Sequence, residues 1–140
     1  MSLFNILNIA GSAMSAQSVR LNTTASNLAN ADSVSSSAET TYRARRPVFA
    51  TALADAMEGE KEGGVGVEVK GIVESQTPLV REYNPGHPMA DKDGFIYRSN
   101  VNQVEEMADM MSASRAYQTN VQVADTAKQL LLQTLRLGKG

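Results

Sequence analysis

The chain has 140 residues, which is enough for one compact domain or one small module with long extensions. Its net charge of -2 provides no overall field that would attract nucleic acid or an anionic membrane. The absence of cysteine excludes disulfides and thiolate metal sites. No run approaches the roughly 18 apolar residues of a membrane span, and no basic residue precedes the N-terminal apolar stretch, so we predict neither membrane insertion nor a cleaved signal peptide.

The N-terminal segment, residues 1–31, has the spacing of a coiled-coil helix. Residues that can pack in a seam recur at alternating intervals of four and three. They are Leu3, Leu7, Ala10, Met14, Gln17, Leu21, Thr24 and Leu28. Arg20 is the only charged side chain in this segment, and Asn, Ser, Thr and Gln fill the other faces. A helix with so little charge is predicted to be surrounded by other protein. The serine-rich stretch that follows predicts its end near Ala31.

Residues 32–101 are predicted to form an irregular linker and a small β module. Arg43, Arg45 and Arg46 precede a proline and therefore predict an extended segment. A short helix is expected over residues 51–57 and a mobile loop over 58–66. Alternating apolar residues over 65–69, with further β-leaning pieces on both sides of Thr77 and Pro78, predict a small β-hairpin or sheet. Asp93 and Gly94, followed by aromatic and β-branched residues, predict a second hairpin.

The last segment, residues 102–140, is predicted to be a second coiled-coil helix. Asn102 can cap its first turn, and Glu105 three residues later completes a pattern like a capping box. Gly138 is the expected stop. The seam again steps by four and three, through Met110, Ser114, Tyr117, Val121, Ala124, Lys128, Leu131 and Leu135. The predicted fold is therefore mainly α, with the two terminal helices paired as an antiparallel coiled coil around an irregular β segment.

Several residue groups could carry chemistry, but each has a simpler interpretation. His87 is the only histidine and lies between glycine and proline, which favours a turn residue over a catalytic base or ligand. Asp91 and Asp93 do not fit a calcium loop, because the first and last ligand positions would fall on non-acidic residues. The three arginines could contact nucleic acid or a membrane, yet intersubunit ion pairs or a solvated face are favoured in an acidic protein. We therefore predict no enzyme, cofactor or metal site.

Ordered motifs make the chain resemble the bacterial flagellar basal-body rod protein family, and within it the C-type proximal rod members. Residues 25–31, Ala-Ser-Asn-Leu-Ala-Asn-Ala, resemble the N-terminal signature of rod and hook proteins. Residues 106–110, followed by Ala113, Arg115, Tyr117 and Asn120, resemble the C-terminal counterpart. Residues 41–49 and 83–88 resemble segments of the C-type members. Ser99 stands where many C-type sequences have proline, so the entry to the last helix differs here.

The resemblance implies a structural subunit exported from the cytoplasm by the flagellar type III apparatus without signal-peptide cleavage. Such subunits polymerise into the periplasmic rod, which transmits torque. The implied partners are copies of this chain, other rod proteins, adjacent basal-body ring components and the export apparatus. The expected assembly interface combines the two seams with the signature residues: Leu3, Leu7, Ala10, Met14, Leu21, Asn27, Leu28, Asn30, Met107, Met110, Ala113, Arg115, Tyr117, Val121, Ala124, Leu131 and Leu135. Without the resemblance, the alternative is a helical-dimer binding module whose β segment recognises a ligand or cell-wall component.

Overall fold

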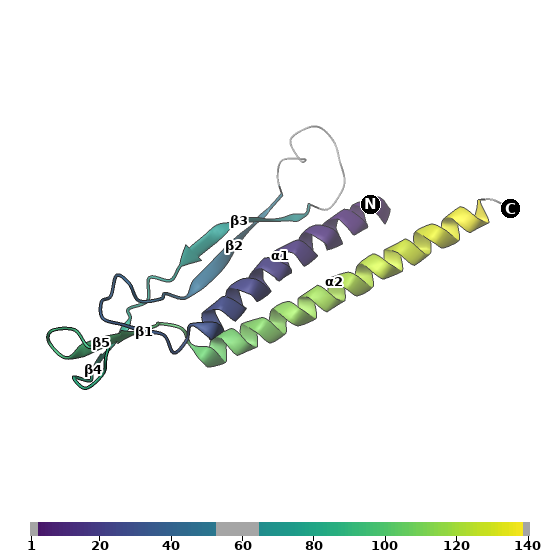
Figure 1. Cartoon of the computed structure of the whole chain (residues 1–140). Helices are drawn as coiled ribbons and strands as arrows, with labels where there is room; N and C mark the ends of the chain where they lie inside the picture. The colour runs from purple at the N-terminus through teal and green to yellow at the C-terminus, as the bar shows by residue number, and fades with distance from the viewer. Residues whose placement is uncertain (1–2, 53–64, 139–140) are drawn as a thin grey trace.

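Two long helices dominate the computed structural model, which describes residues 3–52 and 65–138. Helix α1 (Leu3–Ala29) and helix α2 (Gln103–Leu137) lie side by side and run antiparallel (Figure 1). Helix α2 has 35 residues against 27 in α1, and its C-terminal end extends past the start of α1. The described strands fall between the helices in sequence. The predicted fold, mainly α with paired terminal helices and a small β module, is confirmed.

The ends of α2 follow the local signals in the sequence. The Asn102 side chain accepts hydrogen bonds from the backbone N–H groups of Val104, at 3.1 Å, and Glu105, at 3.4 Å. These bonds satisfy donors that have no partner within the helix, so Asn102 is the predicted N-cap. The second half of the capping box is absent, because the Glu105 carboxylate pairs with Arg46 instead. Helix α2 ends at Leu137, with Gly138 as its C-cap.

A two-stranded antiparallel hairpin lies against α1. Strand β2 (Arg45–Thr51) pairs with strand β3 (Val67–Glu74), and a bulge interrupts the ladder between Val48 and Phe49. In Figure 1, α1 lies between this hairpin and α2. The β segments predicted on both sides of Thr77 and Pro78 are both strands. They do not form a hairpin with each other, because β3 pairs with β2 and residues 80–83 pair within a different sheet.

A second, three-stranded sheet lies at the end of the molecule where α1 finishes and α2 begins (Figure 1). Strands β1 (Val34–Ser35), β5 (Phe95–Arg98) and β4 (Val80–Tyr83) are antiparallel and lie in that order. The predicted second hairpin is present as β4 and β5. However, a loop over residues 84–94 joins the strands, so Asp93 and Gly94 end that loop and do not form a two-residue turn.

Two predictions concern residues that are largely outside the described ranges, namely the short helix over 51–57 and the loop over 58–66. Within them, Thr51 ends β2. None of the helices in the described ranges is both long and apolar enough to span a membrane.

Replacing Gly94 with alanine is expected to lower the free energy of unfolding by about 1–3 kcal/mol. Gly94 has a φ of 82°, and a Cβ there would come within 2.9 Å of Cε2 of Tyr83. Urea unfolding followed by circular dichroism would measure the loss. Gly71→Ala is the matched control, because a Cβ at Gly71 meets nothing within 4 Å. Equal effects of the two substitutions would contradict the described geometry.

Candidate assembly interface

The seam predicted for α1 is covered within the subunit. Ala10 and Thr24 are buried, and the other seam residues of α1 are half-buried. A second set of α1 side chains, Ala16, Thr23 and Asn27, is buried although it lies outside the seam. These residues recur at intervals of four and seven, and the β2–β3 hairpin packs on α1 as well. Helix α1 is therefore covered on two sides, by α2 and by the hairpin.

One of the two residue rows that make up the predicted seam of α2 is displaced by one residue. The buried residues are Glu106, Ala113 and Ala127, spaced by seven, and Asn120 between them is half-buried. The predicted positions Val121 and Lys128 are exposed. Alanine and asparagine allow the helices to approach closely, whereas burying Lys128 would require removing its charge from water. Met110, Ala124 and Leu131, at the other predicted seam positions, are half-buried.

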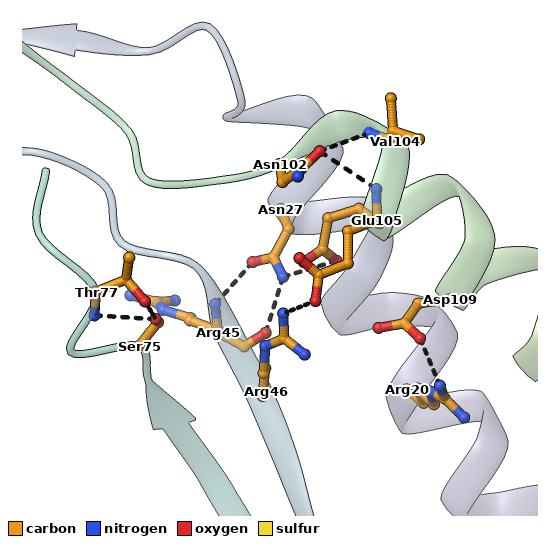
Figure 2. Close-up of polar contacts among 11 residues, drawn as sticks. Arg20, Asn27, Arg45, Arg46, Ser75, Thr77, Asn102, Val104, Glu105 and Asp109 are labelled. Atoms are coloured by element: carbon orange, nitrogen blue, oxygen red, sulfur yellow. Dashed lines mark hydrogen bonds and ion pairs between the residues drawn. The ribbon is translucent and has the colours of Figure 1, made fainter. Parts of the chain in front are cut away.

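Asn27 is the most completely enclosed large side chain in the described structure, with 0% of its surface exposed. Its Oδ1 accepts hydrogen bonds from the Tyr42 hydroxyl and from the Arg45 backbone N–H, both at 2.9 Å. Its Nδ2 donates to the Arg45 backbone carbonyl at 2.8 Å and to Glu106 Oε2 at 3.0 Å. All four hydrogen-bonding positions of the amide are therefore used. We call Asn27, Tyr42, Arg45 and Glu106 the Asn27 hub; Figure 2 shows the two bonds between the Asn27 amide and the Arg45 backbone.

The Asn27 hub joins three elements that are far apart in the sequence. The amide pairs with both backbone groups of Arg45, as a peptide group in a neighbouring strand would, and so ties α1 to the start of β2. The bond to Glu106, which is only 3% exposed, ties α1 to the first turns of α2. A buried polar network that is fully satisfied fixes one arrangement of its elements. The hub therefore sets the register between α1, the hairpin and α2.

Ion pairs surround the hub within the same subunit. Arg20, the single charge of α1, pairs with Asp109 of α2 at 2.7 Å. Arg46 of β2 pairs with Glu105 of α2 at 2.7 Å, and this hydrogen bond raises the pKa of Arg46 (Figure 2). Arg45 pairs with Glu74 across the hairpin. Arg45 and Arg46 therefore pair within the subunit while staying about half exposed, as expected of a solvated face.

The expected interface residues fall into two groups. The first lies buried or half-buried inside the subunit: Leu3, Leu7, Ala10, Met14, Leu21, Asn27, Leu28, Asn30, Met110, Ala113, Ala124 and Leu131. The second is exposed on α2: Met107, Arg115, Tyr117, Val121 and Leu135. The sequence did not predict the hydrogen bonds and ion pairs that Arg20, Tyr42, Arg45 and Glu106 form within the subunit. Their signal in the sequence is weak, because each is a polar residue whose partner lies at least 15 positions away.

An apolar groove of about 320 Å³ lies where the first turns of α1 meet α2. Its lining includes Leu3, Ile6, Val123, Ala127 and Leu130. Leu132, Leu135 and Leu137 are exposed on the last turns of α2, and the C-terminal end of α2 extends past the start of α1 (Figure 1). The helix pair therefore leaves apolar surface uncovered at this end.

Comparison with known proteins gives the family. Residues 7–35 match the profile described as flagella basal body rod protein, and residues 92–137 match flagellar basal body rod FlgEFG protein C-terminal. The chain is 50% identical over 139 residues to flagellar basal-body rod protein FlgC of Salmonella typhimurium, with 99% of this chain and 100% of the relative covered. It is 33% identical over 150 residues to the FlgC protein of Bacillus subtilis, with the same coverage. The chain belongs to the FlgC family of flagellar basal-body rod proteins.

Membership of this family defines the general role. The chain is a structural subunit of the flagellar basal-body rod, and it is not an enzyme. It is located in the flagellar basal body and assembles with other rod and basal-body proteins. The resemblance stated from the sequence motifs is confirmed at the level of the family. The Asn27 hub includes two residues of the matched segments, since Asn27 lies within residues 7–35 and Glu106 within residues 92–137.

Proposed function

We propose that this FlgC-family chain is exported through the flagellar type III apparatus and polymerises through its terminal helices into the proximal, torque-transmitting part of the rod. In this proposal the segments 1–31 and 102–140 form the polymerising helix pair, and residues 32–101 form a separate small module between them. The partners would be copies of this chain, other rod proteins and adjacent ring components, all within the periplasmic part of the basal body.

The observation that carries the proposal is the apolar surface that the helix pair leaves uncovered. Val104 is 76% exposed and Phe4 is 63% exposed, and Met107, Met111 and Leu135 are also open to solvent. The single charge of α1 is used inside the subunit by Asp109. Burying exposed apolar surface against neighbours gains roughly 25 cal/mol per Å². We therefore propose that Met107, Arg115, Tyr117, Val121 and Leu135 contact neighbouring subunits.

The inward residues of the expected interface would act in a different way. Leu3, Leu7 and the other half-buried seam residues hold α1 on α2, so that the outward faces have one fixed geometry. Torque has to be carried by many contacts at once, because a single exposed contact contributes little. We therefore expect single surface changes in residues 32–101 to matter less than charges placed on the apolar side of α2.

We expect the double substitution Met107→Glu and Met111→Glu to abolish incorporation into basal bodies. Both side chains are exposed in the subunit, so the isolated fold should keep its helical signal and unfolding midpoint. Two carboxylates in a contact surface would instead have to be desolvated on assembly. Quantification of the chain in purified basal bodies measures the result. Lys92→Glu, on the exposed 84–94 loop, is the control with unchanged incorporation.

Deletion of residues 3–31 tests the role of the N-terminal helix more severely. If the truncated chain were still found in purified rods, polymerisation through the terminal helices would be refuted. Export has its own readout, which is the N-terminal sequence of the chain recovered from the rods. The proposal requires an uncleaved start, and a form that begins downstream would contradict it.

A further inference from the structure

The sheet formed by β4 and β5 has one aromatic side. Alternate residues of a strand point to opposite faces, and the register pairs Arg81 with Tyr97 and Tyr83 with Phe95. These four residues therefore share one face, which we call the aromatic face. The opposite face carries buried Ile96 and the ion pair between Glu82 and Arg98. Three of the seven aromatic residues of the chain thus lie together on two four-residue strands.

The exposed ring of the aromatic face is held in place. Tyr83 is 65% exposed, so it is not part of the core. Its ring nevertheless meets the ring of Phe95 edge to face, with centroids 5.1 Å apart and an interplanar angle of 64°. The ring also lies close to Gly94, where a Cβ would come within 2.9 Å of Cε2 of Tyr83. A large side chain that is fixed while still exposed loses little conformational entropy when a partner covers it.

Arg81 is also positioned, but its charge is not neutralised. Its guanidinium carbon lies 3.6 Å from the ring centroid of Phe95 and 6.0 Å from that of Tyr97. Arg20, Arg45, Arg46 and Arg98 each form an ion pair. Among the described residues, no carboxylate lies within 4.0 Å of Arg81. Stacking orients the planar fork of donors, which matches a carboxylate in bidentate geometry.

We propose that the aromatic face is a docking surface for a neighbouring subunit of the rod, which presents a carboxylate to Arg81 and an apolar side chain to Tyr83. This inference rests on the proposed function, because it adds a contact to the same assembly. Tyrosine and arginine are enriched among the few residues that dominate protein–protein contacts. The face lies near the end of the molecule where α1 finishes, far from the leucines exposed at the C-terminal end of α2 (Figure 1). It is therefore a contact separate from the helix faces.

A carboxylate on a protein fits this surface better than a phosphate polymer. Arg81 is the only charged residue of the aromatic face, whereas binding to a polyanion grows with the number of cations that neutralise it. The adjacent 84–94 loop carries Asp91 and Asp93 against Lys92, so its own charge repels a polyanion. The exposed Tyr83 ring supplies the apolar contact that a protein side chain can fill.

The test is photocrosslinking in assembled basal bodies. Tyr83 is replaced by p-benzoylphenylalanine in the full chain, and irradiation of purified basal bodies should produce an adduct with a rod protein. The control replaces Val80, which is 55% exposed but points to the opposite face of the same strand. We expect the adduct yield per incorporated chain to be about tenfold higher from position 83. Adding Arg81→Glu should reduce the position-83 yield about tenfold, and Arg81→Lys should reduce it less.

Each outcome decides the proposal. Equal yields from positions 80 and 83, a yield insensitive to Arg81→Glu, or adducts only with a non-protein polymer would overturn it. Incorporation of the chain with no adduct from position 83 would overturn the docking surface alone. Absence of the chain from basal bodies would contradict the proposed function and the docking surface together.

Discussion

Asn27→Ala is expected to lower the free energy of unfolding by about 3–5 kcal/mol, because it leaves several buried polar groups without a partner at about 1–3 kcal/mol each. The substitution leaves the Glu106 carboxylate buried with its Asn27 bond gone. It also removes the partner of both Arg45 backbone groups and of the Tyr42 hydroxyl. Single domains are stable by only about 5–15 kcal/mol. The loss is therefore a large fraction of the total, and urea unfolding followed by circular dichroism would measure it.

Two further substitutions separate the hub from a general effect of removing asparagine. Asn30→Ala removes a side chain from the same end of α1, but that side chain makes one bond to the Ser26 carbonyl and is half-buried. We expect it to cost about 1 kcal/mol. Asn27→Asp keeps the shape but replaces the donor to Glu106 with a second carboxylate. At neutral pH, Asn27→Asp should lower the free energy of unfolding at least as much as Asn27→Ala does. Part of this stability should return in acid, because protonation of a carboxylate removes the repulsion between the two acidic side chains.

Hydrogen exchange would locate the damage. If the hub sets register, Asn27→Ala should increase amide exchange at the start of β2 and in the first turns of α2, as well as at the end of α1. Exchange that increased only near residue 27 would show that the three elements are not coupled through this side chain. An unfolding free energy within 1 kcal/mol of the unaltered chain would contradict the fourfold role of the amide.

The helices were predictable because their signals are local. Apolar spacing of three and four repeats over many turns, and Asn102 lies where its side chain can reach the first free N–H groups. The β pairing was not predictable in the same way. Residues 67–74 have clear strand character, but the residues they pair with lie 16 to 29 positions upstream, and apolar alternation does not indicate which segment a strand pairs with. The sequence therefore predicts strands in this region but does not predict which of them pair.

The seam of α2 shows a second limit. The heptad spacing placed part of the seam at Val121 and Lys128, which are exposed, whereas Ala113 and Ala127 are the buried alanines of α2. Small residues such as alanine allow two helix backbones to approach closely, but they contribute little to an apolar pattern in the sequence. The Asn27 hub is harder still to predict. Its four partners are polar or backbone groups from three elements, and nothing in the local sequence distinguishes a fully satisfied asparagine from a solvated one.

Ala113→Asp is expected to separate the two helices. Ala113 has no exposed surface in the described subunit, so the introduced carboxylate would lie in the seam between α1 and α2. We expect a loss of about 3 kcal/mol or more in the free energy of unfolding at neutral pH, since an unpaired buried charge is among the most damaging changes. Ala108→Asp is the matched control, because it makes the same change on an exposed position of the same helix. The free energy of unfolding of Ala108→Asp should fall by less than about 1 kcal/mol, which is the cost of replacing alanine by aspartate in an exposed part of a helix.

The pH dependence of the stability of Ala113→Asp and Ala108→Asp distinguishes the effect of a buried charge from the effect of a larger side chain. Burial raises the pKa of an introduced carboxyl above its unfolded value, so the penalty is full above the folded pKa and disappears as pH falls below the unfolded pKa. The difference between the two variants should therefore shrink when unfolding is measured near pH 3. Ala113→Leu has no charge and should instead show a pH-independent cost of about 1–3 kcal/mol from overpacking. If Ala113→Asp were as stable as Ala108→Asp at neutral pH, then the close approach of α1 and α2 at Ala113 would not exist in the isolated subunit, and the seam would form only after neighbours had assembled.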